Sequence, residues 1–373
     1  MIEAAPLSPP RSVRSSHLRR ATAPIEPLPA TSAAHVLILF RSSHAPVNPH
    51  CAVGLGVNAL HTVRVLRRHG VDARAYGVWK PEDVHARLES HPKTTHCILE
   101  APWVPLDAMH VLLAAFPDVH FVVRSHSQIG FLQVEAGAIR LIRELMIEQD
   151  GVTNLAVATN SKRLALFIEE TYDGPCLFLP NLYDLERAKR KHRPPHDHRA
   201  LRIGSFGALR LLKNHTTAAA AALLVARERR CDLEFWVNDD RDPHGVGILH
   251  ALRAMFDGLH WAKLVEAPWA DWAGFRRCVA HMDLCMQLSA TETFNLTTAD
   301  ATSEGVASVV TPVVEWAPDY WKVDTDAVED AARVAGHLLS SPTAAHDGIV
   351  SLQRFVEGAV HDWLRYFSAP QGA

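Results

Sequence analysis

The chain has 373 residues, 48% of them hydrophobic and 21% charged, which is the composition of a globular protein and a length that favours two domains over one. Its formal net charge of −3 excludes a global electrostatic attraction to nucleic acids or anionic membranes. No apolar run approaches the length needed to cross a bilayer, so we expect a cytoplasmic protein without stable membrane association.

The N-terminal segment, residues 1–33, is rich in proline, serine, arginine and alanine and lacks the apolar stretch of a secretory signal, which predicts a disordered tail. An organellar transit peptide is less favoured because Glu3 and Glu26 are acidic and prolines are frequent. The cysteines show no CxxC pair and no zinc-ligand spacing, which predicts reduced thiols. They are Cys51, Cys97, Cys176, Cys231, Cys278 and Cys285.

The first domain is expected over residues 34–183. Residues 36–40 form a continuous apolar run, typical of a strand buried on both faces of a parallel sheet. A helix is expected at 58–69, with Gly70 as its stop, and a strand at 73–78. Further strands are expected at 97–99, 119–123 and 155–158, with helical patterns between them, notably at 134–149. This alternation predicts a Rossmann-like doubly wound α/β domain.

A basic, proline-broken stretch at 184–200 predicts a linker. Its three histidines, His192, His196 and His198, are better read as solvated residues than as metal ligands. The second domain, 201–345, again alternates. Strands are expected at 201–206, 232–237, 261–265, 283–288 and 306–310, and helices at 216–229, 247–256, 274–281 and 294–304. An amphipathic helix at 349–367 dominates the last segment, 346–373, and is expected to pack back across both domains.

Two acidic residues stand out in the second domain. Glu292 follows a buried strand and Asp300 lies eight residues later on the next helix, slightly over two helical turns away. This spacing directs both carboxylates to the carboxyl ends of the strands, where open α/β sheets bind ligands. We expect them to bind hydroxyl groups rather than a metal.

The run of residues 291–310 around these carboxylates resembles the E-x7-E motif of retaining, family-4-like GT-B glycosyltransferases. The resemblance implies two Rossmann-like domains facing each other, with Glu292 near the donor sugar and Asp300 on the ribose hydroxyls. It assigns four residues between them to the donor site: Thr293, Phe294, Asn295 and Leu296. The chain departs from the motif twice, with aspartate in place of glutamate at position 300 and asparagine in place of glycine at position 295.

A second segment, residues 203–215, resembles the family's strand, glycine-containing loop and basic pair. Gly207 lies in the loop, and Arg210 and Lys213 precede a helix that begins near Asn214. A guanidinium fork, an ammonium and a helix N-terminus all attract phosphate. In the family the two basic positions neutralise the diphosphate leaving group, so the resemblance implies that no metal is required.

Other segments match more loosely. Residues 154–161 and 177–184 resemble the paired segments that end the N-terminal domain in this family, and His126 resembles a histidine placed near the donor sugar. Gly54 and Gly56 correspond to a glycine loop that precedes the first long helix. They are not a dinucleotide fingerprint, because Ala59 stands at the third glycine position. Trp269 follows a strand and is a candidate to stack on the base.

The sequence therefore predicts a metal-independent hexosyltransferase that moves a sugar, glucose-like by family habit, from a UDP-sugar co-substrate and needs no other cofactor. Arg210 and Lys213 would stabilise the leaving diphosphate, with Glu292 and His126 at the sugar. The acceptor stays open among a saccharide, a protein, a small molecule and a hydroxylated base in DNA. Two alternatives have the same scaffold: a non-catalytic nucleotide-binding protein, and a UDP-sugar epimerase or hydrolase.

Overall fold

The structure is a computed structural model that describes residues 34–42, 54–185, 200–238 and 246–369. The predicted tail and most of the predicted linker lie outside these residues, as does Cys51. The described residues belong to one compact unit. Within the described part of the chain, no helix is long and apolar enough to span a membrane.

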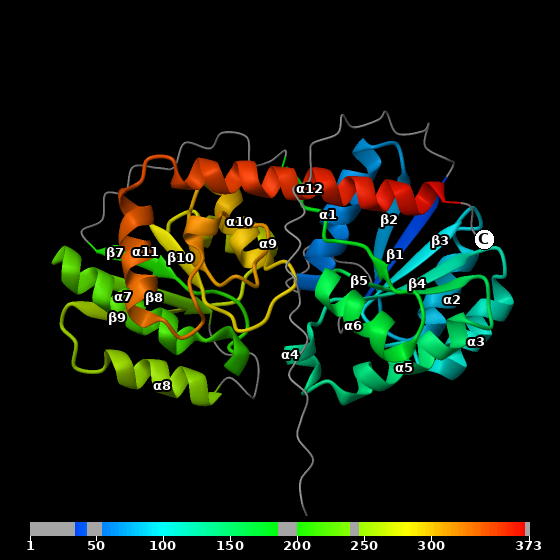
Figure 1. Cartoon of the computed structure of the whole chain (residues 1–373), viewed down its shortest axis with the longest axis horizontal. Coiled ribbons are helices and arrows are strands. Elements are labelled where there is room, and N and C mark those ends of the chain that lie inside the picture. Colours follow the sequence, from blue (N-terminus) through cyan, green and yellow to red (C-terminus); the bar gives the residue numbers. More distant parts are fainter. Residues whose placement is uncertain (1–33, 43–53, 186–199, 239–245, 370–373) are drawn as a thin grey trace, which may run out of the picture. The chain divides into compact units, whose positions relative to one another are not determined.

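The first half of the chain forms a parallel sheet with strand order β2-β1-β3-β4-β5-β6 (Figure 1). The strands are β1 (His35–Arg41), β2 (Asp72–Val78), β3 (His96–Glu100), β4 (His120–Ser125), β5 (Leu155–Thr159) and β6 (Leu177–Phe178). The helices are α1 (Gly54–Arg68), α2 (Pro81–Glu89), α3 (Leu106–Ala115), α4 (Ile129–Leu132), α5 (Ala136–Gln149) and α6 (Lys162–Tyr172).

Strand β1 shows why this sheet is covered on both faces. Val36 and Ile38 pack in one hydrophobic cluster with α1, whereas Leu37 and Leu39 pack in another with α2, α3 and α5. Successive side chains of a strand point to opposite faces, so a continuous apolar run requires helices on each side. The expected doubly wound arrangement is confirmed.

The second half forms a parallel sheet with strand order β11-β10-β7-β8-β9. Its strands are β7 (Leu201–Gly204), β8 (Leu233–Asn238), β9 (Ala262–Ala267), β10 (Leu284–Gln287) and β11 (Ser308–Val310). Its helices are α7 (His215–Arg229), α8 (Val246–Phe256), α9 (Trp272–Val279), α10 (Leu296–Ser303) and α11 (Val328–Ser340), with short 3-10 turns at Leu211–Lys213 and Asp319–Trp321. We call the two halves the first and second lobes.

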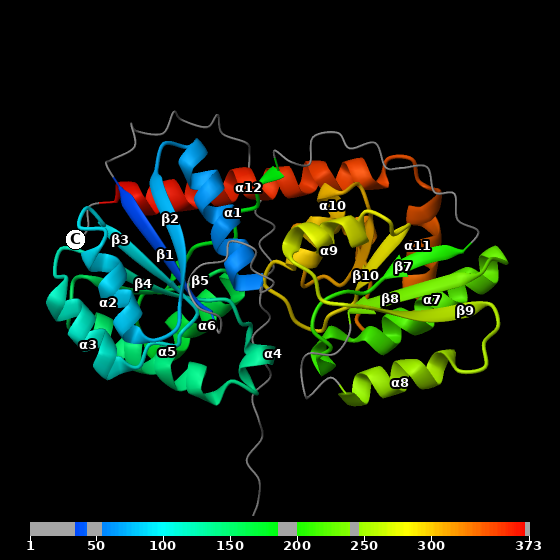
Figure 2. The same ribbon diagram turned by 180° about the vertical axis from the view of Figure 1, so that it is seen from behind.

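The long helix α12 (Ala344–Ser368) contacts both lobes (Figure 2). Near its start, Gly348 packs directly against the buried ring of Trp321 in the second lobe. Near its end, the indole nitrogen of Trp363 donates a hydrogen bond of 2.7 Å to the carbonyl oxygen of Pro180 in the first lobe. One hydrophobic cluster runs from β1 through α12 to the second sheet, so the helix joins the two cores.

One expected boundary is wrong. Gly54 and Gly56 do not form a loop before the first long helix, because α1 begins at Gly54 and both glycines lie in its first turn. The apolar positions used to place the helix begin at Ala59, and glycine is a poor helix former, so the pattern did not extend the helix back to Gly54. The helices α2, α3, α4, α6 and α11 were not placed individually by the sequence patterns.

Candidate functional site

The centre of the candidate site is an ion pair between the two predicted donor-site segments. Lys213 ends a 3-10 turn after β7, and its Nζ donates to Oε1 of Glu292 in the loop between β10 and α10. Ser289 Oγ and Asn295 Nδ2 donate to the same oxygen over 3.1 and 3.2 Å. Oε2 of Glu292 accepts no hydrogen bond from a described residue. The carboxylate is thus held through one oxygen, and the other can accept a ligand's hydrogen bond.

Asn295 explains how the loop keeps its shape without the glycine of the motif. Its φ of 57° is left-handed, a conformation that asparagine tolerates better than most residues. Its Oδ1 accepts the backbone N–H of Thr298 at 2.8 Å and so caps α10. Its Nδ2 contacts Gln287 Oε1 at 3.3 Å as well as Glu292. The asparagine therefore supplies the turn, the helix cap and a hydrogen bond to the motif's first carboxylate.

Both predicted diphosphate ligands face an aromatic ring of the first lobe. The Arg210 guanidinium carbon lies 5.9 Å from the centre of the Phe131 ring in α4, and Lys213 Nζ lies 5.6 Å from it. Gly207, with a φ of 110°, donates its backbone N–H to Asn238 Oδ1 at 2.8 Å, which ties the loop after β7 to the end of β8. Two cations are thereby gathered at the carboxyl ends of the second sheet.

The donor loop also touches the first lobe directly. Gln128 Nε2 donates to the backbone oxygen of Glu292 at 3.1 Å, and Asn160 Nδ2 donates to Thr293 Oγ1 at 3.0 Å. Gly130 packs so closely on Thr291 that a Cβ there would lie 2.9 Å from the threonine methyl group. A glycine is needed at this approach, where α4 meets the loop that carries Glu292.

A fully buried arginine organises the carboxyl ends of the first sheet. Arg124 donates to both oxygens of Glu100 at 3.0 and 2.9 Å, to the backbone oxygen of Leu179 at 2.7 Å and to Asn181 Oδ1 at 2.6 Å. His126 Nε2 also donates to Glu100. Burial raises the pKa of Glu100, but the charge of Arg124 and the hydrogen bonds from Arg124 and His126 outweigh it and hold that pKa below its usual value.

Hydrogen-bond partners fix which atoms of this network carry hydrogens. The Arg124 guanidinium only donates, so the Asn181 atom that it contacts is the carbonyl oxygen. The Asn160 atom 3.0 Å from that oxygen is then the amide nitrogen. That nitrogen has two hydrogens and three acceptors around it, Asn181 Oδ1, Thr293 Oγ1 and, at 3.2 Å, His126 Nδ1, so Nδ1 shares one of them. His126 Nε2 faces the Glu100 carboxylate, which only accepts, so the ring hydrogen sits on Nε2. His126 is a neutral imidazole, consistent with burial lowering its pKa.

Asp300, the second acidic position of the motif, belongs to a separate buried cluster. Its Oδ1 accepts hydrogen bonds from Tyr183 Oη at 2.7 Å and Trp272 Nε1 at 2.9 Å. The imidazole of His61 in α1 stacks on Tyr183 with ring centres 4.2 Å apart. Burial raises the pKa of Asp300 to about 6. Its Oδ2 accepts no hydrogen bond from a described residue, so one oxygen is left to meet the ribose hydroxyls that the resemblance assigns to it.

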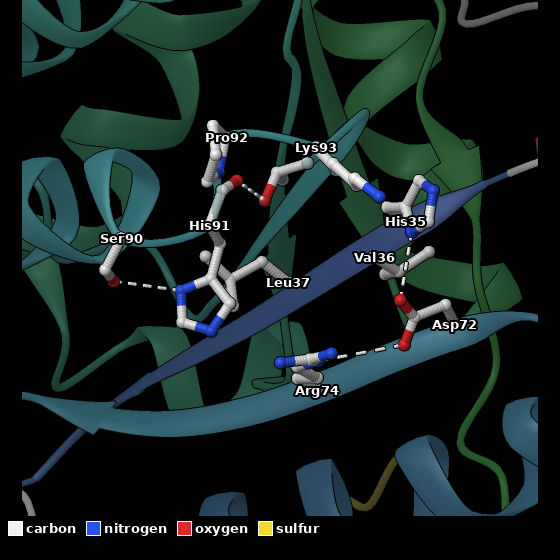
Figure 3. A pocket seen from close by; sticks show the side chains of 10 residues that line it. His35, Val36, Leu37, Asp72, Arg74, Ser90, His91, Pro92 and Lys93 are labelled. Atoms are coloured by element: carbon white, nitrogen blue, oxygen red, sulfur yellow. Dashed lines mark hydrogen bonds and ion pairs between the residues drawn. The ribbon is translucent and has the colours of Figure 1, made fainter.

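A cavity of about 320 Å³ lies at the opposite end of the first sheet (Figure 3). Its lining comes from the amino ends of β1 and β2 and from the turn after α2. His35 and Asp72 pair at 2.9 Å, Arg74 approaches Asp72 at 3.7 Å, and His91 contacts Ser90 at 3.0 Å. The polar groups of this cavity are therefore largely satisfied by one another, and none of the predicted donor-site residues lines it.

Comparison with known proteins identifies the fold of the chain but no relative of similar sequence. No known protein-family profile and no curated protein matches the chain. Among solved structures, sucrose-phosphate synthase from Thermosynechococcus elongatus is 14% identical with a TM-score of 0.63, over 89% of this chain and 98% of its own. Anabaena HepE, solved with UDP and glucose, is 15% identical with a TM-score of 0.61, over 90% and 100%. The chain has the GT-B fold.

A S. aureus TarM variant solved with UDP is 13% identical with a TM-score of 0.52, and the match covers 73% of this chain and 55% of that longer one. Identities this low establish the GT-B fold alone. The fold confirms the predicted class of two Rossmann-like lobes, whereas the roles of individual residues stay predictions.

Within the GT-B fold, the structure separates the predicted residues into groups. Hydrogen bonds link Lys213 and Asn295 to Glu292, and Thr293, the next residue along the chain, is connected to His126 through Asn160. Three others lie elsewhere. Phe294 is buried with its ring 5.4 Å from that of Phe355, Leu296 packs on the same core, and Trp269 is half-buried in the loop between β9 and α9.

Sequence reasoning missed several residues that the structure places at the site. They are Gln128, Phe131, Asn160, Tyr183, Trp272 and Ser289. Asn160 and Tyr183 lie inside the segments 154–161 and 177–184, which resemble the family. Their position in these segments is a signal that could have marked them as site residues. The other four lie in loops or at helix starts, with no local pattern to mark them.

Proposed function

We propose that the chain is a retaining glycosyltransferase that moves a sugar, glucose-like, from a UDP-sugar to an acceptor hydroxyl without a metal ion. The Lys213–Glu292 pair carries the proposal, because it brings the basic residue and the acidic residue of two separate motifs together at the strand ends of the second lobe. The GT-B fold adds support, since HepE, which shares that fold, was solved with UDP and glucose.

The basic groups suit a diphosphate leaving group. Negative charge builds on the departing diphosphate as its bond to the sugar breaks, and cations placed there beforehand stabilise that charge. Lys213 and Arg210 supply two such cations beside the start of α7. Lys213 would exchange its pairing with Glu292 for the diphosphate when a donor binds.

Glu292 remains held when Lys213 leaves it. Ser289 and Asn295 still donate to Oε1, so the carboxylate keeps its orientation and can accept a hydroxyl of the donor sugar through Oε2. At the nucleoside end, Oδ2 of Asp300 would accept from the ribose, and the first turn of α1 with Gly54 and Gly56 would contact phosphate or acceptor. Retention then follows from attack by the acceptor hydroxyl on the face that the diphosphate leaves: the new bond to the sugar forms as the sugar–diphosphate bond breaks, and the departing diphosphate takes the acceptor's proton.

UDP release tests the proposal. The full chain is incubated with UDP-glucose or UDP-N-acetylglucosamine and with a panel of saccharides, small alcohols, proteins and DNA containing hydroxymethylated bases. Lys213→Ala is expected to lower kcat/KM by about 100-fold or more, the usual loss of one charge-stabilising group, and Glu292→Gln is expected to lower it as well.

The matched control is Lys322→Ala. Lys322 lies in the same lobe, its side chain is 17% exposed against 19% for Lys213, and it pairs with Asp319 at 2.9 Å. Its loss should leave turnover unchanged. Equal activity of the Lys213 and Lys322 variants would contradict the proposal. UDP release that needs no acceptor would indicate a hydrolase, an altered sugar with no UDP release an epimerase, and donor binding without turnover a binding protein.

A further inference from the structure

The network around Arg124 leaves one buried atom without a partner. Oδ1 of Asn160 is inaccessible to solvent and has no hydrogen bond to a described residue. Asn160 as a whole is 4% exposed, so this oxygen lies inside the protein. A buried acceptor without a donor costs about 1–3 kcal/mol, and such atoms are rare in folded proteins. A hydrogen-bond donor from a ligand would remove this cost.

The amide of Asn160 cannot turn to relieve that cost. Its nitrogen faces Asn181 Oδ1, and this oxygen is fixed by the charged Arg124 guanidinium. Exchanging the amide nitrogen and oxygen would place two carbonyl oxygens 3.0 Å apart, and would lose the donation to Thr293. The orientation is therefore imposed by a buried charge, and the unpaired oxygen is built into the site.

The sequence resemblance places His126 near the donor sugar, but its ring nitrogens are occupied by contacts within the protein. Its Nε2 donates to Glu100 and its Nδ1 accepts from Asn160, so both ring nitrogens are already engaged. The polar atom at the end of the chain Glu100, His126, Asn160 is Oδ1 of Asn160. In this arrangement His126 and Glu100 orient a neighbour and leave the contact with ligand to that neighbour.

We infer that Asn160 binds the donor sugar, accepting a hydrogen bond from one of its hydroxyl groups through Oδ1 once the entering donor displaces the groups that cover this oxygen. Asn160 Nδ2 donates to Thr293, which directly follows Glu292, so Asn160 borders the loop that carries the free Oε2 of Glu292. Both atoms are acceptors, which suits a hydroxyl-bearing sugar and disfavours a phosphate. His126 and Glu100 are positioning residues that act through Asn160. The inference rests on the proposed function.

The test is calorimetric titration of the full chain with UDP and with UDP-glucose. Asn160→Ala should bind UDP-glucose about tenfold more weakly than the wild type, the worth of one such hydrogen bond, and bind UDP within twofold of it. The control is Asn154→Ala, which removes a buried amide at the other end of β5, where its Nδ2 lies 3.4 Å from the Leu113 carbonyl. It should leave both affinities unchanged.

Deoxygenated donors add a second arm. UDP-glucose analogues lacking the 2-, 3-, 4- or 6-hydroxyl are titrated into the wild type and the variant, with Asn160→Ser in place of Asn160→Ala if the alanine variant does not fold. One analogue should bind the wild type about tenfold more weakly and show no further loss in the variant.

Equal losses for UDP and UDP-glucose, no loss for either, or full additivity for all four analogues would overturn the inference. A wild type that binds neither UDP nor UDP-glucose would instead overturn the proposed function.

Discussion

Replacing Asp300 by asparagine should flatten part of the pH dependence of stability. The pKa of this buried carboxyl is raised to about 6 from 3.8, so the folded state keeps a proton that the unfolded state releases between these values. The protonated Asp300 contributes to the free energy of unfolding, and this contribution is fully present below pH 3.8 and is lost as pH rises through 6. The whole shift corresponds to about 3 kcal/mol, of which about 1.4 kcal/mol falls between pH 5 and 7.5.

Asparagine keeps an oxygen for Tyr183 and Trp272 but does not ionise. Urea unfolding of both proteins at pH 5 and 7.5, with coincident fluorescence and circular dichroism transitions, gives the comparison. The difference in unfolding free energy between Asp300→Asn and wild type should shift by about 1.4 kcal/mol in favour of the variant at the higher pH. The control is Asp347→Asn, since Asp347 accepts from Tyr320 at 2.7 Å near the surface. An Asp300→Asn difference that does not change with pH would refute the reasoning.

Three further substitutions have clear expectations in urea unfolding. Asn295→Gly keeps the left-handed turn and loses only the cap and hydrogen bonds of the amide, whereas Asn295→Ala loses these as well and should cost about 1–2 kcal/mol more; equal costs would contradict a left-handed requirement. Glu100→Gln should destabilise by about 3 kcal/mol because its arginine partner stays buried; a neutral effect would refute this. Gly348→Ala should lower the free energy of unfolding by about 1–3 kcal/mol because the new methyl group meets Trp321. Gly358→Ala on the same helix has open space around it and should raise the free energy of unfolding by about 0.5–1 kcal/mol. Equal effects of the two substitutions would show that packing against Trp321 does not determine the cost.

The fold was predictable because its main signals are local. The continuous apolar run of β1 requires helices on both faces, and the same pattern recurs along both halves of the chain. Helix boundaries were less accurate where the signal depends on tertiary contacts. The first turn of α1 contains Gly54 and Gly56, poor helix formers whose place in a helix is not set by propensity.

The candidate site was predictable only where one short segment contains it. Glu292 and Lys213 were found because each lies in a motif, and the structure joins them. Asn160 and Trp272 act through contacts with residues far away in sequence, and no period or composition marks such contacts. The departure at position 295 was visible, but its meaning depended on a backbone angle that the sequence does not display.

Both acidic positions of the motif are tied to the first lobe, which affects how their substitutions are read. Glu292 is held through its backbone oxygen by Gln128, and Asp300 through its side chain by Tyr183. Aspartate is one methylene shorter than the glutamate of the motif, which leaves room for the tyrosine hydroxyl and the indole of Trp272. Replacing Asp300 by alanine would therefore take away a contact between lobes together with the proposed ligand for the donor, whereas any substitution of Glu292 keeps its contact because a backbone atom makes it. A loss of activity at 292 consequently reports on the chemistry of the carboxylate more directly than a loss at 300.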